Sequence, residues 1–144
     1  MTESLLDPRH CVANNLFETA RAVARLYAEE MRRAGLARSQ FAILNHLDRS
    51  GATALTALAD RLYMDRTTMT RNLAPLERAG LVLRECSADD ARVKVICISA
   101  DGRRKLLMAR RLWRKAQRRM LKLLGEAQWR ELESQLTALR RLVK

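Results

Sequence analysis

The chain has 144 residues, 28 of them Lys or Arg and 16 Asp or Glu, which gives a formal net charge of +12. A hydrophobic fraction of 48% is ordinary for a folded protein and argues against wholesale disorder. Such a positive excess on a folded chain indicates a polyanionic partner, nucleic acid first and an anionic membrane surface second.

Several function classes are disfavoured. No apolar run approaches the roughly 18 residues that span a bilayer, and the N-terminus has no signal pattern, so we expect a cytoplasmic protein without a membrane partner. The cysteines are Cys11, Cys86 and Cys97, in no CxxC arrangement, so we expect free thiols. Only two histidines are present, so we expect no metal site and no cofactor. Nucleotide-loop, hydrolase and metalloprotease motifs are also missing, which disfavours an enzyme.

The N-terminal third predicts two helices. Asp7 is a cap residue and Pro8 suits the first helical position, and apolar residues then recur at steps of three and four up to Gly35. This pattern predicts a first helix that ends at a left-handed glycine cap. A second helix is predicted over residues 39–50, before Gly51.

Two short helices in tandem come next. Residues 55–62 carry one apolar stripe, and a second helix begins after Asp65 and stops at Gly80. Its core side is predicted to consist of Met69, Leu73 and Leu76. The pair predicts a helix-turn-helix.

The pattern then changes to strands and back to helices. Residues 81–85 and 93–98 are rich in β-formers around a polar turn at 87–91, which predicts a two-stranded hairpin, or wing. Residues 101–124, with Ser99 as cap, and the residues after Gly125 return to helical spacing.

The predicted fold is mainly α with a small β-hairpin wing. Residues 35–100 form a winged helix-turn-helix that binds DNA, and residues 1–34 and 101–144 form dimerisation helices. The terminal helices have long apolar seams and little core of their own, so a homodimer is expected. Antiparallel packing of these helices within one chain is the alternative.

The second short helix carries side chains that suit DNA bases. Arginine can bind guanine with two hydrogen bonds, and threonine can contact thymine or phosphate from the first turns of a recognition helix. The candidates on residues alone are Thr67, Thr68, Thr70 and Arg71. The alternative is an ordinary solvated helix face. Pro75 lies inside this helix and either bends it or is tolerated near its end.

The wing tip holds a second candidate contact. Asp90 and Arg92 are two residues apart, so in an extended chain the carboxylate can brace a guanidinium that enters a minor groove. Lys94 is the third wing residue assigned to DNA. The alternative is a charged tip that only aids solubility.

Ten basic residues between positions 103 and 122 are interrupted by no acidic residue. Three roles are open for these residues: a solvated helix face, a second contact to the DNA backbone, or a long-range electrostatic field that steers DNA toward the protein. A rival function of a different class uses this run as a basic helical interaction module that holds an acidic protein or a membrane surface.

The order of elements resembles the MarR family of bacterial transcriptional regulators. Its strongest matches are MDRTTMTRNL at 64–73 and DAR at 90–92. Further matches lie at 35–36, 40–44, 58–60, 76–77, 80–82, 98–99 and 102. The resemblance covers nearly the whole chain.

The resemblance implies a homodimeric repressor on a pseudo-palindromic operator of double-stranded DNA. The base-contacting helix would span Arg66 to Asn72, and Arg92, braced by Asp90, would enter the minor groove. A small, often aromatic or phenolic, effector would release DNA from a cleft between the dimer helices and the winged module. Candidates to line that cleft are Asn14, Phe17, Phe41, Asn45, Met108 and Leu112.

Some members of the family sense peroxides through a cysteine early in the first helix, which Cys11 resembles in position. A helix N-terminus can lower a thiol pKa. Those sensors have tyrosines farther along the helix, whereas this chain has Asn15 and Arg25 at such spacings and only Tyr27 nearby. A repressor switched by oxidation of Cys11 is therefore an alternative mode of regulation.

Overall fold

The computed structural model describes residues 2–87, 89–90 and 92–143. Two residues of the predicted wing turn, Ala88 and Ala91, lie outside these described residues. The chain forms two compact units, one of residues 31–112 and one of the residues up to Glu30 together with those from Trp113 onward. The long helix α5 (Ala100–Leu124) contributes residues to both units.

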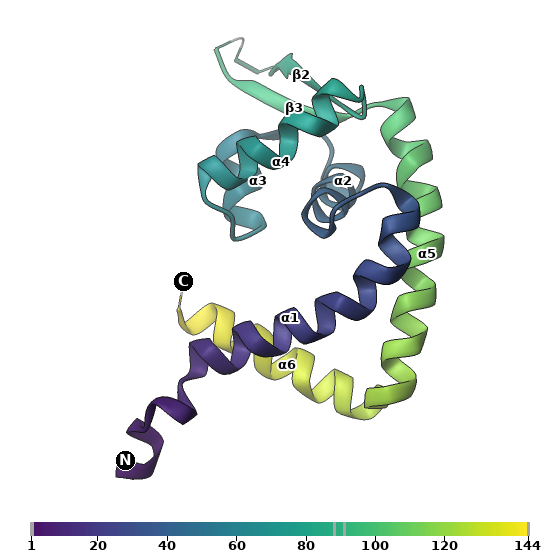
Figure 1. Cartoon of the computed structure of the whole chain (residues 1–144). Coiled ribbons are helices and arrows are strands. Elements are labelled where there is room, and N and C mark those ends of the chain that lie inside the picture. The colour runs from purple at the N-terminus through teal and green to yellow at the C-terminus, as the bar shows by residue number, and fades with distance from the viewer. Residues whose placement is uncertain (1, 88, 91, 144) are drawn as a thin grey trace. The chain divides into compact units, whose positions relative to one another are not determined.

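The unit of residues 31–112 is a winged helix-turn-helix. Figure 1 shows α4 beside the β2–β3 hairpin, and α2 and α3 contact both α4 and β3. Its elements before α5 are η3 (Arg32–Ala34), α2 (Arg38–Ser50), β1 (Thr53–Ala54), α3 (Leu55–Arg61), α4 (Arg66–Arg78), β2 (Val82–Cys86) and β3 (Lys94–Ile98). The predicted fold class is confirmed.

The sheet has one strand more than the predicted hairpin. Its order is β1-β3-β2, with both pairings antiparallel. Strand β1 is only two residues long and pairs Thr53 with Ile96. Alternation cannot show in a two-residue strand, so the sequence pattern missed β1.

Apolar side chains from every layer of this unit meet in one core. The three residues predicted for the inner side of α4, Met69, Leu73 and Leu76, are at most 1% exposed. Burial of each such side chain contributes about 1.5–3 kcal/mol. The other fully buried large residues of the unit are Ile43, Leu44, Leu47, Leu58, Val82, Ile96 and Leu106.

Among its described residues, the second unit contains helices and the short breaks between them, and no strand. It contains η1 (Glu3–Leu6), η2 (Pro8–His10), α1 (Val12–Met31), the second half of α5, and α6 (Glu126–Leu142). Tyr27 of α1 donates a hydrogen bond to Gln117 of α5. Ion pairs join Lys115 to Glu30 at 2.9 Å and Arg119 to Glu29 at 2.8 Å, so polar contacts connect the last turn of α1 to the second half of α5. Burial raises the pKa of the Tyr27 hydroxyl, so it remains a donor at neutral pH.

The predicted start of the first helix is wrong. Asp7 does cap a turn, because its carboxylate accepts from the backbone N–H of Arg9 at 2.8 Å and also binds the Arg9 guanidinium. These contacts close a tight 3₁₀ turn over Pro8–His10, and Cys11 is then extended. The α-helix begins only at Val12, and Gly35, at φ +62°, ends the short η3 that follows it.

Asp65 fixes the start of α4. Its carboxylate accepts from the backbone N–H of Thr68 at 2.7 Å and from the Thr68 hydroxyl at 2.6 Å. The hydroxyl contact first, and the backbone contact second, hold the pKa of Asp65 below its ordinary value. The helix then runs unbroken through Pro75 to Arg78.

None of the helices among the described residues is long and apolar enough to cross a membrane.

Gly102 in the first turn of α5 marks a close approach of two backbones. A Cβ at this position would collide with the carbonyl oxygen of Leu81 and lie 2.8 Å from Cγ1 of Ile98. The same Leu81 carbonyl accepts from the N–H of Ser99, whose hydroxyl accepts from the N–H of Gly102 at 2.9 Å. Ser99 thus caps α5 as predicted, and the absence of a side chain at Gly102 lets the first turn of α5 lie against the backbone of Leu81, just before β2.

We predict that Gly102→Ala lowers the free energy of unfolding by about 1–3 kcal/mol, because the added methyl overpacks a backbone contact. Without that contact, alanine would stabilise the helix by about 1 kcal/mol relative to glycine. The sign of the change in the free energy of unfolding therefore shows whether the close contact exists. Urea denaturation measures it. Arg111→Ala, at an exposed position of the same helix, is the control. A Gly102→Ala protein as stable as its parent would contradict the close approach.

We predict that Asp65→Ala lowers the melting temperature at neutral pH, because the cap of α4 is lost. The depressed pKa means that the stabilisation is fully present above the unfolded-state pKa and is lost as the pH falls through the lower folded-state pKa. The difference in melting temperature between parent and variant therefore shrinks in acid. Asp65→Asn keeps an uncharged cap and is the control. A difference that stays constant from neutral to strongly acidic pH would argue against an ionised cap.

Candidate nucleic-acid interface

The outer side of α4 presents cations and hydroxyl groups. Four polar side chains of the helix are exposed, Arg66, Thr67, Thr70 and Arg71, and of these Thr67 and Arg71 lie opposite the buried residues. They occupy the first two turns of the helix, where a recognition helix reaches base edges. The burial of the opposite side fixes this orientation, so these four side chains are available for DNA.

Two other predicted contacts are used inside the protein. Asn72 donates from Nδ2 to the carbonyl of Thr68 at 2.8 Å, and its Oδ1 accepts from the hydroxyl of Ser39 at 2.5 Å. The hydroxyl of Thr68 is bound to Asp65. Asn72 therefore ties α4 to the first turn of α2, and Thr68 belongs to the cap.

Ser39 is a positioning residue that sequence reasoning did not find. It lies 33 positions from its partner in the chain, so no local pattern could reveal the bond. The backbone conformation of Tyr63, in the turn between α3 and α4, was also not predicted from the sequence. This residue has φ +53° and a side chain that is 60% exposed. Glycine is the residue expected at such an angle, so the pattern of the sequence gives no signal there.

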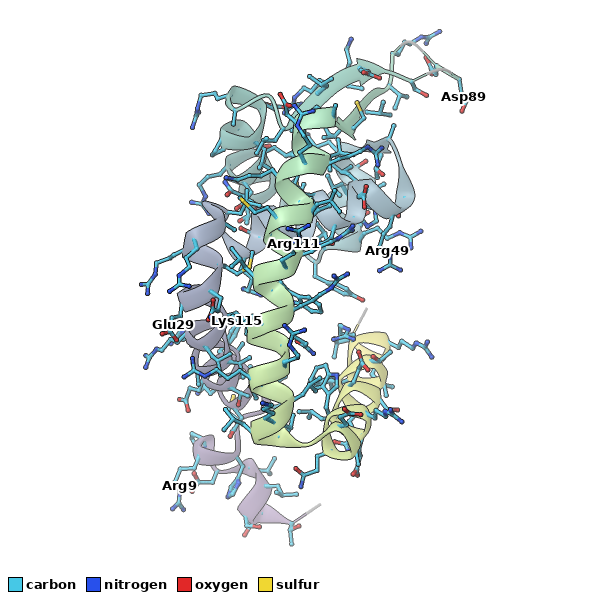
Figure 2. The ribbon with its side chains drawn as sticks, turned by 90° about the vertical axis from the view of Figure 1, so that its right-hand side faces the viewer. Arg9, Glu29, Arg49, Asp89, Arg111 and Lys115 are labelled. Atoms are coloured by element: carbon cyan, nitrogen blue, oxygen red, sulfur yellow. The ribbon has the colours of Figure 1, made fainter. Side chains whose placement is uncertain are left out.

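The wing turn is shaped by Asp90. Its Oδ1 accepts from the backbone N–H of Arg92 at 2.9 Å, and its carbonyl accepts from the N–H of Val93 at 2.9 Å. The carboxylate thus braces the backbone of Arg92, whereas the sequence predicted a contact with its guanidinium. Arg92 and Lys94 are both exposed, and Figure 2 shows neighbouring Asp89 at the tip of the hairpin.

An ion pair connects strand β2 of the wing to α4. Arg84 of β2 forms an ion pair with Glu77, in the last turns of α4. This pair links the strand that leads to the wing tip to the helix that faces outward. Glu77 and Arg84 are therefore positioning residues for both parts of the interface.

The cysteines whose side chains the structure describes are both free thiols. Cys97 lies in β3 opposite Leu83. The pKa of its thiol is raised, mainly by burial and to a smaller extent by a hydrogen bond with Glu85 and by the charge of Glu85. Cys11 is half-buried just before α1, and its carbonyl accepts from the Asn15 amide at 2.9 Å. Regulation by oxidation of Cys11 remains a prediction.

The predicted effector residues are divided between the units. Asn14 and Phe17 are exposed on α1, with Phe17 64% exposed. Phe41 and Asn45 lie one turn apart on α2, joined by a bond from Asn45 Nδ2 to the Phe41 carbonyl at 2.9 Å. The remaining two, Met108 and Leu112, are on α5. The effector cleft itself remains a prediction.

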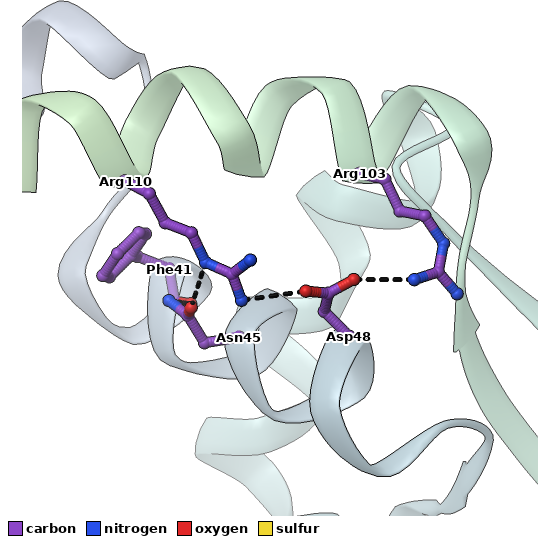
Figure 3. Close-up of polar contacts among 5 residues, drawn as sticks. All are labelled: Phe41, Asn45, Asp48, Arg103 and Arg110. Atoms are coloured by element: carbon purple, nitrogen blue, oxygen red, sulfur yellow. Dashed lines mark hydrogen bonds and ion pairs between the residues drawn. The ribbon is translucent and has the colours of Figure 1, made fainter.

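A polar network joins α2 to the first half of α5 (Figure 3). The two carboxylate oxygens of Asp48 bind Arg103 at 2.6 Å and Arg110 at 2.9 Å. Arg110 also donates from Nε to Oδ1 of Asn45 at 2.9 Å. Asp48 is only 21% exposed, so these pairs are screened less than surface pairs.

This network accounts for part of the basic run between positions 103 and 122. Arg103 and Arg110 pair with Asp48, and Arg104 pairs with Asp101 of the same turn. Lys115 and Arg119 pair with carboxylates of α1. Half of the ten cations, all among the described residues, thus pair with carboxylates, and four of these five join α5 to another helix. Among the residues that the structure describes, no three His, Cys, Asp or Glu side chains form a group suited to a metal ion.

The chain resembles known regulators over most of its length. The family model described as MarR family matches residues 36–94. A curated relative from Bacillus subtilis, the uncharacterised HTH-type transcriptional regulator YxaD, is 29% identical over 100 residues, which are 69% of this chain and 70% of that protein.

Solved structures agree with the sequence match. The transcriptional regulator MosR of M. tuberculosis, solved in complex with DNA, is 32% identical with a TM-score of 0.80, over 92% of this chain and 96% of MosR. Bordetella bronchiseptica BpsR, whose DNA binding is regulated by 6-hydroxynicotinic acid, shares the fold at 17% identity and a TM-score of 0.82, over 90% of this chain and 93% of BpsR. The chain belongs to the MarR family of winged-helix, DNA-binding transcriptional regulators.

Proposed function

We propose that the protein is a homodimeric repressor that binds a pseudo-palindromic operator and releases it when a small aromatic ligand binds. The observation that carries this proposal is the start of α4, which has four exposed cationic and hydroxyl side chains on a helix whose inner side holds three fully buried ones. A helix held in this way can enter a major groove without losing its core contacts.

Exposure and hydrogen bonds separate the residues that contact DNA from the residues that position α4. Arg66, Thr67, Thr70 and Arg71 are the base and phosphate contacts, because their side chains are exposed. Asn72 and Thr68 set the position and cap of the helix. Arg92 on the Asp90-shaped turn is the minor-groove contact, and Lys94 binds backbone phosphate.

A second copy of the chain is the partner that suits the helical unit. Large apolar side chains are exposed on η1, on α1, on the second half of α5, on α6 and on the residue that follows α6. They are Leu5, Leu6, Val12, Leu16, Phe17, Leu123, Leu132, Leu142 and Val143. Monomeric proteins rarely leave so much apolar surface in water. Leu123 and Leu132 belong to the seams that the sequence assigned to dimerisation.

Ligand control is supported by the example of BpsR, whose DNA binding responds to an aromatic acid. In the present chain, Phe41 and Asn45 lie on α2, and Asn45 belongs to the network that continues to α5. A ligand in contact with these residues touches the connection between the winged unit and its long helix.

The operator itself is tested by sequencing genomic DNA fragments that co-purify with the protein at near-physiological salt. Enrichment of a site with two half-sites about one helical turn apart supports the proposal. Equal recovery of all fragments contradicts it.

We predict that Arg71→Ala weakens operator binding by about 1–3 kcal/mol and relaxes base preference at one position in each half-site. Arg92→Ala weakens binding with little change in major-groove preference. Fluorescence anisotropy with operator variants measures both effects. Arg111→Ala, which removes an exposed cation of α5 in the same unit, is the control. Arg71→Ala binding no weaker than this control would refute base contact by α4.

We predict that Phe17→Glu dissociates the dimer. In a two-fold dimer the substitution removes one phenylalanine side chain from each protomer. The loss of both from the interface weakens the free energy of dimerisation by about 3–6 kcal/mol. Sedimentation velocity at micromolar concentration then shows a monomer for the variant and a dimer for the parent. Ser134→Glu, a charge added at an exposed polar position of α6, serves as the control. A monomeric parent would exclude the proposed assembly.

A further inference from the structure

Tyr63 has a backbone conformation that a tyrosine rarely adopts. Its φ is +53°, and every other described residue with a φ in this region is a glycine. For a bulky side chain the region is unfavourable, because Cβ comes too close to the following carbonyl oxygen. Such a conformation persists only where the surrounding structure imposes it, and it is found most often at functional sites.

The end of α3 imposes this conformation through the backbone. The N–H of Met64 donates to the carbonyl of Ala59 at 3.0 Å, and the N–H of Tyr63 donates to the carbonyl of Asp60 at 3.3 Å. This pair of hydrogen bonds is the Schellman motif, whose left-handed position is usually a glycine. The tyrosine side chain therefore has no part in forming the turn.

The same motif at the end of α4 has the glycine. There the N–H of Leu81 donates to the carbonyl of Leu76 and the N–H of Gly80 to the carbonyl of Glu77, both at 2.9 Å. Gly80 has φ +67°. The chain thus has the unstrained residue at one helix end and a strained one at the other, although the hydrogen bonds are alike.

Burial of the ring does not explain the tyrosine. Tyr63 is 60% exposed, so the hydrophobic effect offsets little of the strain. The motif needs an apolar residue directly after its left-handed position, and the half-buried Met64 fills that place. An exposed ring with a terminal hydroxyl is instead available to a partner outside the chain.

Tyr63 lies directly before the helix that faces DNA. The turn that carries it joins α3 to α4 (Figure 1) and is followed by the cap Asp65 and the exposed Arg66. In a helix-turn-helix the first helix crosses the DNA backbone and the second enters the major groove. The turn between them is therefore close to phosphates, to which a tyrosine hydroxyl can donate a hydrogen bond.

We propose that Tyr63 contacts DNA, its hydroxyl donating a hydrogen bond to a backbone phosphate at the edge of the groove that α4 enters. The inference rests on the proposed function only in that α4 enters the groove. It adds a residue to the interface and gives a reason for the strained turn. Because the donor is uncharged, the contact positions α4 without displacing a counterion.

The first test measures binding of the full-length protein to a fluorescein-labelled duplex of mixed sequence by fluorescence anisotropy. A phosphate contact does not depend on base sequence, so no operator is needed. Tyr63→Phe keeps the ring and removes only the hydroxyl. It should bind at least about fivefold more weakly, since a hydrogen bond to a charged group is lost. The dependence of affinity on salt should stay as in the parent, whereas Arg66→Gln should make it less steep.

The matched control is Tyr27→Phe, which removes the other tyrosine hydroxyl of the chain, bound to Gln117 in the helical unit. This variant should bind the duplex like the parent. Tyr63→Gly removes the ring and the strain together. It should melt at or above the temperature of the parent in circular dichroism, yet bind the duplex at least about fivefold more weakly.

Fluorine NMR tests the contact directly. The chain has two tyrosines, so protein labelled with meta-fluorotyrosine gives one signal for each, and the Tyr63 signal is the one that Tyr63→Phe lacks. A saturating amount of duplex should shift the Tyr63 signal and leave the Tyr27 signal in place.

Three results would overturn the proposal. They are parent-like affinity in Tyr63→Phe, an unmoved Tyr63 signal at saturating duplex, and a Tyr63→Gly protein that melts below the parent, which would assign the ring to stability. Failure of the proposed function is a separate observation: genomic fragments are then recovered equally, while the effect of Tyr63 on the mixed-sequence duplex remains measurable.

Discussion

The burial of one side of α4 is the constraint on which the interface depends. Met69, Leu73 and Leu76 are almost completely excluded from water in the core of the winged unit. Rotation of the helix by half a turn would expose all three and cost several kcal/mol, so the exposed side has no freedom to change. The cap at Asp65 and the bond from Ser39 to Asn72 add directional contacts at the start and middle of the same helix. The hydrophobic effect thus selects the outward side, and hydrogen bonds refine it.

Some polar side chains of this protein are exposed and others bind a neighbouring helix, and the sequence pattern does not distinguish the two. Arg71 and Asn72 are neighbours on α4, yet one is exposed and the other binds α2. Arg110 and Arg111 are neighbours on α5, and only the first takes part in the Asp48 network. In a helix, consecutive residues point about 100° apart, so adjacent polar residues meet different surroundings.

Elements with a local cause were predictable from the sequence. The cap at Asp65, the core side of α4, the cap at Ser99 and the glycine between α5 and α6 all follow from spacing and residue type, and the structure has them. Features with a distant cause were not. The partner of Asn72 comes from another helix, and β1 exists because two residues pair with β3. The break at Cys11 was missed because a capping Asp followed by Pro starts a 3₁₀ turn as well as an α-helix, and the sequence pattern does not distinguish the two. In the candidate site, residue types were predictable, but which of them are exposed required the fold.

The surroundings of Cys97 bear on the chemistry of the wing. Because burial and Glu85 raise the pKa of this thiol, a very small fraction is thiolate at neutral pH. Thiolate is the form that attacks peroxides and alkylating reagents, so Cys97 is a poor nucleophile. The strand that leads from the wing to α5 therefore carries a thiol that reacts with oxidants more slowly than a thiol of ordinary pKa.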